Sequence, residues 1–401
     1  MTKTTFCHVR STLTGDMQEI QLLLAQSQTT LAQLAFELMA LLGMGLVWWL
    51  VALGPQSPCA TAWRSLFGLV ARLTIGLGLL WLTVMASAWP PLLERTGNVL
   101  GPMIAGLVAV MLVTETLAYR LASRPDHGVR SVADWLTAIG FSLAYALVLL
   151  AQSWMREPVG TALIDGRYQV IEWSAIVQAQ AFSRALLATA FSAALLLGVL
   201  VQWSVQTPNH GVTGSSTAQS TTAQSTIALS TMALSTAGQR AMTGLGVAGL
   251  LGWLWLLSQA VGGQLNPATQ STQTLYEALL YGAANWPLRV TFVLWLVTLA
   301  GLVVGLGSAG DTGKIAAWIT RVPVISAPLL WLGAWWQLFI LPQQSLTAGL
   351  PLADLVSMQP AWALAAGLAL VGLVVVLSFG LFVRFLVRAR PDGDHAQGAR
   401  T

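Results

Sequence analysis

The sequence predicts an all-α membrane protein: a bundle of about nine transmembrane helices, with the N-terminus outside and the C-terminus in the cytoplasm. Of its 401 residues, 55% are hydrophobic and only 8% are charged, and the mean hydropathy is +0.69. One soluble core cannot bury this much apolar surface. Long apolar stretches, each able to cross about 30 Å of hydrocarbon, recur along the chain. Because lipid offers no partner for backbone N–H and C=O groups, such stretches form helices.

The apolar stretches divide the chain into five parts. These are a polar, interfacial N-terminal segment (1–29), five transmembrane helices (30–204), a flexible cytoplasmic linker rich in Ser and Thr (205–240), four transmembrane helices (241–388) and a cytoplasmic tail (389–401). The linker has too little apolar surface to offset the entropy of ordering. The predicted spans are 30–53, 65–88, 97–121, 131–154, 181–204, 241–262, 286–308, 318–341 and 361–388.

The positions of arginine and lysine predict the orientation. If the N-terminus is outside, the inner loops and tail hold most of these residues, including the cluster Arg120, Arg124 and Arg130. An odd number of spans then places the C-terminus inside. The net charge of +4 is therefore a topology signal. A nucleic-acid partner is not predicted, because no basic face is clustered in a soluble part of the chain.

Two carboxylates, Glu37 and Glu115, lie well inside predicted spans. Intramembrane ionisable groups are rare and often mark proton or ion pathways, so both are candidate proton-path residues. Glu115 also has a structural explanation, because it is near the inner end of its span and can reach the interface or pair with Arg120. No phosphate-binding loop, nucleophile elbow or metalloprotease histidine pair is present, and no metal site is predicted. Because of Glu37 and Glu115, an alternative function for the chain is a proton-coupled or small-molecule transporter.

Two segments carry a resemblance to a known family. Residues 135–140 read Trp-Leu-Thr-Ala-Ile-Gly, and residues 152–160 read Gln-Ser-Trp-Met-Arg-Glu-Pro-Val-Gly. They resemble the Trp-Leu-x-Ala-x-Gly helix of cytochrome bd quinol oxidase subunit I and its ending, Asn-Gly-Trp-Met-Gln-x-Pro-x-Gly. The motif residues that match at the end of this helix are Trp154, Met155, Pro158 and Gly160. The smaller subunit II of this family shares the general helix arrangement, so a subunit II-like ancestry is an alternative. The matched motifs favour subunit I.

The resemblance implies haem, yet the ligand positions differ. The family's ligands are histidines of the first and fifth helices, a methionine of the seventh and a glutamate of the eighth. None of the four histidines of this chain falls in a predicted span, and Arg184 cannot replace an imidazole because it stays protonated and has no lone pair to donate. No haem is therefore predicted, although a quinone or lipid in the core stays open. The positions that correspond to the ligands hold Leu34, Arg184, Thr291 and Gly333.

Together these features predict a haem-free structural or accessory subunit in a respiratory electron-transport complex of the bacterial inner membrane. Membrane lipid and other cytochrome bd-type subunits are its expected partners, and the chain is not expected to be catalytic alone. Arg184 and Arg289 are candidate contacts for an anion or a haem propionate, and Arg289 also has a structural explanation as a cap at the outer interface. A functional quinol oxidase subunit is the remaining alternative.

Overall fold

The computed structural model describes residues 3–53, 60–122, 132–205, 236–261, 286–307, 319–335, 346–347, 350–351, 355–356 and 359–388. Within these ranges, eight helices are long and apolar enough to cross a membrane, so the prediction of an all-α membrane bundle is confirmed. Within the span predicted at 318–341, the structure describes a helix of 13 residues, α12 (Pro323–Trp335), and residues 336–341 lie outside the described residues. Most of the predicted linker, residues 206–235, and the tail from 389 lie outside the described residues.

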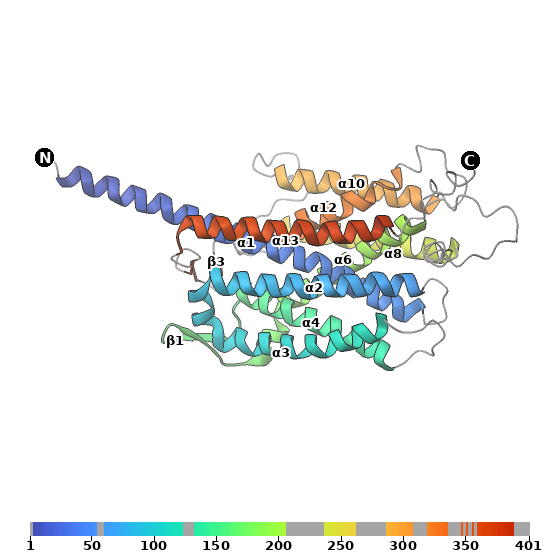
Figure 1. Cartoon of the computed structure of the whole chain (residues 1–401), viewed down its shortest axis with the longest axis horizontal. Helices are drawn as coiled ribbons and strands as arrows, with labels where there is room; N and C mark the ends of the chain where they lie inside the picture. The colour runs from blue at the N-terminus through green and yellow to red at the C-terminus, as the bar shows by residue number, and fades with distance from the viewer. Residues whose placement is uncertain are drawn as a thin grey trace, which may run out of the picture.

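The long helices lie side by side with their axes nearly aligned (Figure 1). Two short hairpins and one short helix, α5 (Trp173–Gln178), complete the described structure. The hairpins pair β1 (Thr161–Ile164) with β2 (Arg167–Val170) and β3 (Leu346–Thr347) with β4 (Leu350–Pro351), both antiparallel. The long helices are α1 (Lys3–Leu53), α2 (Ala60–Ala88), α3 (Pro90–Ala122), α4 (Val132–Arg156), α6 (Gln180–Val205), α8 (Thr236–Val261), α10 (Trp286–Gly307) and α13 (Ala361–Arg388).

Helix α1 is the central element of the bundle. It packs against α2, α4, α6 and α13. In its membrane-spanning part, 72% of the most apolar window is buried, against 11% for α13. The polar residues before the first predicted span continue the same helix, whose N-terminal end projects beyond the bundle (Figure 1). A polar side chain on the spanning part of α1 is therefore enclosed by other helices.

The β1–β2 hairpin covers one end of the bundle, and this end is called the hairpin side below. The segment that matches the family motif leads into it. Trp154 at the end of α4 packs edge-to-face on Tyr168 of β2, with ring centroids 5.3 Å apart. Gly160 has a φ of +71°, and a Cβ there would collide with the carbonyl oxygen of Glu172. Glycine suits this position because it adopts positive φ without a steric penalty.

Helices α6 and α8 come into backbone contact through glycines. A Cβ added to Gly198 would lie 2.6 Å from the Cα of Gly246 and 2.8 Å from the carbonyl oxygen of Met242. Small residues permit this approach, which is a common way of packing helices in membranes.

Candidate functional site

The candidate site is built around Glu37, which α1 places in the interior with 0% of its surface exposed. Gln33, one turn earlier on the same helix, donates from Nε2 to Glu37 Oε1 over 2.8 Å. Gln152 of α4 donates from Nε2 to the same oxygen over 2.5 Å. Both amide donors are themselves buried. Two helices therefore converge on one carboxylate oxygen.

The second carboxylate oxygen has a different environment. Glu37 Oε2 makes no hydrogen bond of standard geometry to any described residue, although the indole of Trp335 lies beside the carboxyl group. The buried hydroxyl of Tyr145 is within electrostatic range of Glu37 and also lies near Thr189 of α6. Helices α1, α4, α6 and α12 thus all contribute side chains to this centre, which is called the Glu37 centre below.

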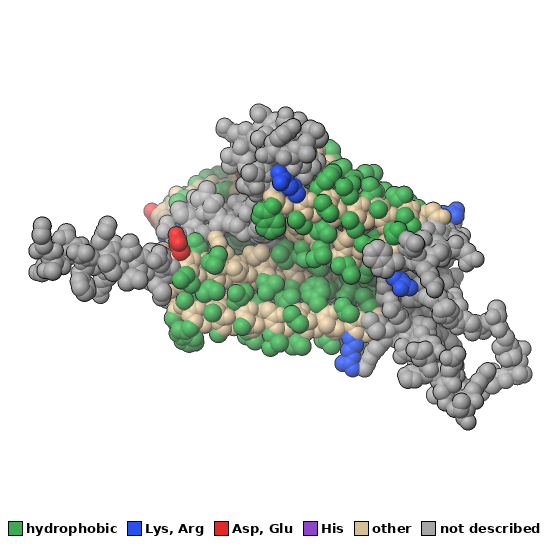
Figure 2. Space-filling view, turned by 90° about the horizontal axis from the view of Figure 1, so that it is seen from above, with side chains coloured by type: hydrophobic (Ala, Val, Ile, Leu, Met, Phe, Trp, Pro, Cys, Tyr) green, Lys and Arg blue, Asp and Glu red, His purple; other side chains and the backbone are tan. Residues whose placement is uncertain are grey.

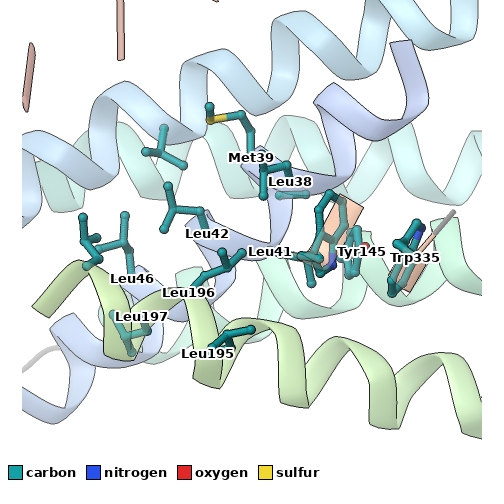
Figure 3. Packing of buried hydrophobic residues seen from close by; sticks show 14 of the residues in the cluster. Leu38, Met39, Leu41, Leu42, Leu46, Tyr145, Leu195, Leu196, Leu197 and Trp335 are labelled. Atoms are coloured by element: carbon teal, nitrogen blue, oxygen red, sulfur yellow. The ribbon is translucent and has the colours of Figure 1, made fainter. Parts of the chain in front are cut away.

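A tryptophan cluster backs the Glu37 centre. Trp335 stacks on Trp331 with ring centroids 5.6 Å apart, and it meets Trp253 of α8 edge-on at 6.2 Å. All three side chains are fully buried. Figure 3 shows Tyr145 and Trp335 close to one another, at the end of a row of packed leucines that includes Leu41. The polar centre therefore lies between an aromatic cluster and an aliphatic core.

The structure brings together two of the four positions that the resemblance predicts for haem ligands, Thr291 and Gly333. A Cβ added to Gly333 of α12 would lie 2.7 Å from Oγ1 of Thr291 on α10. Thr291 is buried, and its hydroxyl donates to the carbonyl oxygen of Pro287 over 2.8 Å. Leu34 packs against the apolar core, and Arg184 near the start of α6 donates to Gln180 Oε1 over 3.1 Å.

These four side chains do not fit a haem held as the family resemblance implies. Haem iron takes an imidazole, thioether, thiolate or phenolate as its axial ligand. Leucine and glycine have no donor atom, and a guanidinium has no lone pair to give. Between Gly333 and Thr291 there is also no free space, because even a methyl group would collide there.

The other predicted residues lie away from the Glu37 centre. Glu115 is on the exposed face of α3, about two turns before the end of the span at Leu121. Arg289 is exposed in the first turn of α10. Helices α3 and α10 contribute no side chain to the Glu37 centre. No described contact therefore connects Glu115 with Glu37. The roles of Glu115, Arg184 and Arg289 stay predictions.

Two cavities in the described part of the structure differ in their lining. A polar hollow of about 610 Å³ lies between the hairpin and the start of α3, where Arg167 bridges Glu94 at 3.2 Å. The other, of about 220 Å³, is almost wholly apolar and lies between α2, α3 and α4, beside Trp81 and Ala151. Trp81 stacks on Phe36, the residue next to Glu37. The lining of the apolar cavity suits a hydrocarbon chain.

The sequence indicates Glu37 as a candidate but not the residues that contact it. Gln33 is four residues before Glu37, and this spacing places two side chains on one face of a helix, so it could have been noticed. Gln152 stood in the matched motif without an assigned role. Trp335 is 298 positions away in the chain, and only the packing of α12 reveals its place.

Comparisons with known proteins agree with this architecture. The family model for cytochrome bd terminal oxidase subunit I matches residues 24–244, more than half of the chain. The solved structure of the bd oxidase from Geobacillus thermodenitrificans superimposes with a TM-score of 0.65 and 14% sequence identity, covering 92% of this chain and 98% of that one. At this identity, the match shows a shared fold. No curated protein sequence matches. From its sequence and its fold, the chain belongs to the cytochrome bd terminal oxidase subunit I family.

Proposed function

We propose that this chain is a haem-free, structural or accessory subunit of a bd-type respiratory complex in the bacterial inner membrane, beside a partner that carries the redox centres. The main support for this proposal is that none of four side chains can serve as an axial ligand of haem iron. These side chains are Leu34, Arg184, Thr291 and Gly333. Family membership supports the placement in an oxidase-type assembly. The buried tryptophans beside Gly333 support it too, because they fill the interior with protein.

The purified chain should contain no stoichiometric haem. It would be expressed alone with haem supplied, purified in mild detergent and assayed by the pyridine haemochrome method, with a haem-loaded bd oxidase prepared in parallel as the positive control. The expected result is a haem-to-chain ratio near zero, because no axial ligand stands at the four family positions. One or more haems per chain would overturn the proposal and favour an active quinol oxidase subunit.

An exposed face formed by α2 and α3 supports a protein partner. Arg72 is exposed on α2, whose membrane span begins at Trp63. It lies nine residues into this span, or about 13 Å along the helix axis. Glu115 is exposed on the neighbouring helix α3. Charged groups at such depth are costly against lipid and usually face protein or water. Small residues share this face: a Cβ on Gly76 or Gly101 would meet nothing within 4 Å.

Within the described residues, α10 and α13 carry no charged side chain in the middle of their spans. Exposed side chains in the middle of α10 and α13 are bulky and apolar, such as Val293, Leu296, Leu373 and Val376. Figure 2 views the molecule from the side of these two helices and shows a mostly hydrophobic described surface with few charged side chains. An apolar surface of this kind suits lipid. We therefore assign α2 and α3 to the partner subunit, and α10 and α13 to the bilayer.

Replacing Arg72 should weaken the complex. We expect Arg72→Leu to lower the yield of co-purified partner subunit about tenfold or more. In the proposed interface Arg72 pairs with a carboxylate of the partner, and leaving such a carboxylate buried without its counter-charge costs about 2–5 kcal/mol. The measurement is affinity purification from native membranes with quantification of the companion chains. Arg384→Leu, an exposed arginine on α13, is the matched control and should leave the yield unchanged. Equal yields from both variants would contradict the assignment of this face.

The alternative function, a proton-coupled or small-molecule transporter, draws on the burial of Glu37. The same purification separates the two functions. Companion oxidase subunits favour the accessory role, whereas recovery of the chain as a lone homo-oligomer favours a transporter.

A further inference from the structure

We propose that Glu37 is a reversible proton-binding site in the middle of the bundle, and that it exchanges its proton with water on the hairpin side of the membrane. Binding forms an O–H bond at Oε2 with a proton taken from water, and release returns that proton to water. The inference concerns a site that the haem-ligand positions do not include. It therefore holds or fails independently of the proposed function.

The carboxyl group of Glu37 is buried among uncharged groups. Moving a carboxylate out of water costs several kcal/mol even after the protein relaxes, unless a cation compensates it. Glu37 is fully buried, and its contacts are the amides of Gln33 and Gln152 and an indole, all of them uncharged. Oε2 has no hydrogen bond of standard geometry from the described residues. A proton on Oε2 is the smallest ligand that removes the charge.

The charged groups on the surrounding helices do not supply a counter-ion. Tyr145 of α4 is the ionisable group within electrostatic range of Glu37. Helix α12 contains no ionisable residue. On the helices around the centre, the charged residues whose side chains the structure describes lie near helix ends or, for Arg72, on an exposed face. They are Glu19 on α1, Arg64 and Arg72 on α2, Asp134 and Arg156 on α4, Arg184 on α6, Arg240 on α8 and Arg384 on α13.

Polar side chains of α1 lie between Glu37 and the hairpin side of the membrane. Between Glu37 and this end, α1 presents polar side chains to its neighbours rather than a continuous apolar surface. Gln33 contacts Glu37 directly, and Gln28 is a further buried amide. The hydroxyl of Thr29 accepts a hydrogen bond from Trp89 Nε1 over 2.7 Å, and Gln21 Nε2 donates to the carbonyl oxygen of Gln359 over 2.9 Å. In the proposal, these polar groups form hydrogen bonds to water molecules along the helix, and the water carries the proton.

Toward the other side of the membrane, α1 is closed by aliphatic packing. From Glu37 to Leu53 the helix runs for 16 residues, about 24 Å. Its buried side chains there include Leu38, Met39, Leu41, Leu42 and Leu46, which pack with the leucines of α6 (Figure 3). Such packing excludes water, because protein interiors have few voids large enough to hold it. The route to Glu37 is therefore polar on one side only.

Infrared spectroscopy tests the proton directly. The protein in lipid nanodiscs at neutral pH should show the C=O stretching band of a protonated carboxylic acid, and that band should shift in D₂O. Glu37→Gln, which keeps the shape and removes the acid, should abolish the band. Glu115→Gln, an exposed carboxylate on another spanning helix, should leave it intact. Absence of the band in the unmodified protein, or its persistence in a folded Glu37→Gln variant, overturns the proposal.

Reconstituted vesicles test the side of exchange. The chain is inserted in one orientation, verified by protease cleavage of a site placed in the Asp165–Gly166 turn, and the pH is then changed on one side at a time. The band should respond when the pH on the hairpin side changes and not when the other side changes. Gln33→Leu should slow the response at least severalfold, whereas Met39→Leu should not. A response only from the opposite side overturns the assigned access route.

Discussion

Trp253→Ala should lower the free energy of unfolding by about 3–5 kcal/mol, the usual cost of removing a large buried aromatic side chain. Trp253 is fully buried and meets Trp335 edge-on at 6.2 Å, and Trp335 in turn stacks on Trp331. The three rings fill the space behind Glu37, so the cavity left by alanine cannot close without moving α8 or α12. Since close-packed interiors relax only partly, most of the lost contact energy is not recovered.

Trp255→Ala is the matched control for this prediction. Trp255 is on the same helix two residues later, but 50% of its surface is exposed. Its replacement should therefore cost much less than that of Trp253. Reversible unfolding in mixed micelles, followed by tryptophan fluorescence, measures both variants. Equal losses of stability would mean that the tryptophan cluster is not the rigid interior that the structure describes.

Gly198→Ala should lower the free energy of unfolding by about 3 kcal/mol, near the upper end of the usual cost of overpacking. The added methyl group would lie 2.6 Å from the Cα of Gly246 and 2.8 Å from the carbonyl oxygen of Met242. Both atoms belong to the backbone of α8, so no side-chain rotation can relieve the collision. Helices α6 and α8 would have to separate, and this would also disturb the leucines of α6 that pack against α1.

Gly244→Ala, on α8, separates this effect from helix propensity. A Cβ at Gly244 would meet nothing within 4 Å. Alanine is the better helix former by about 1 kcal/mol, so this variant should be neutral or slightly stabilised. The same unfolding measurement compares the two variants. A Gly198→Ala protein as stable as Gly244→Ala would contradict the close approach of α6 and α8.

The long hydrophobic stretches made the fold class predictable. In a bilayer, such a stretch forms a helix because the helix satisfies its own backbone N–H and C=O groups. Within the stretch predicted at 318–341, the described helix α12 begins at Pro323, and residues 336–341 lie outside the described residues. Apolar composition predicts that a segment avoids water, but it does not fix the residue at which its helix begins.

The candidate site was predictable only in part. Glu37 stood out because an acidic residue within an apolar stretch is rare, and this signal is local. Glu115 carried the same local signal, yet the structure places it on an exposed face of α3. Which of two intramembrane carboxylates faces the interior depends on the rotation of each helix about its axis. Packing against neighbouring helices sets that rotation, and the neighbours are distant in the sequence.

The sequence by itself determined that the chain is an all-α membrane protein resembling cytochrome bd subunit I, and it predicts Leu34, Arg184, Thr291 and Gly333 at the family's ligand positions. Residue identity and hydropathy are enough for these conclusions. Only the tertiary structure decided that Gly333 lies against Thr291, and that Gln152 and Trp335 meet Glu37. Those contacts join residues 42, 115 and 298 positions apart. They arise because burying side chains between helices, rather than any local preference of the chain, fixes which faces come together.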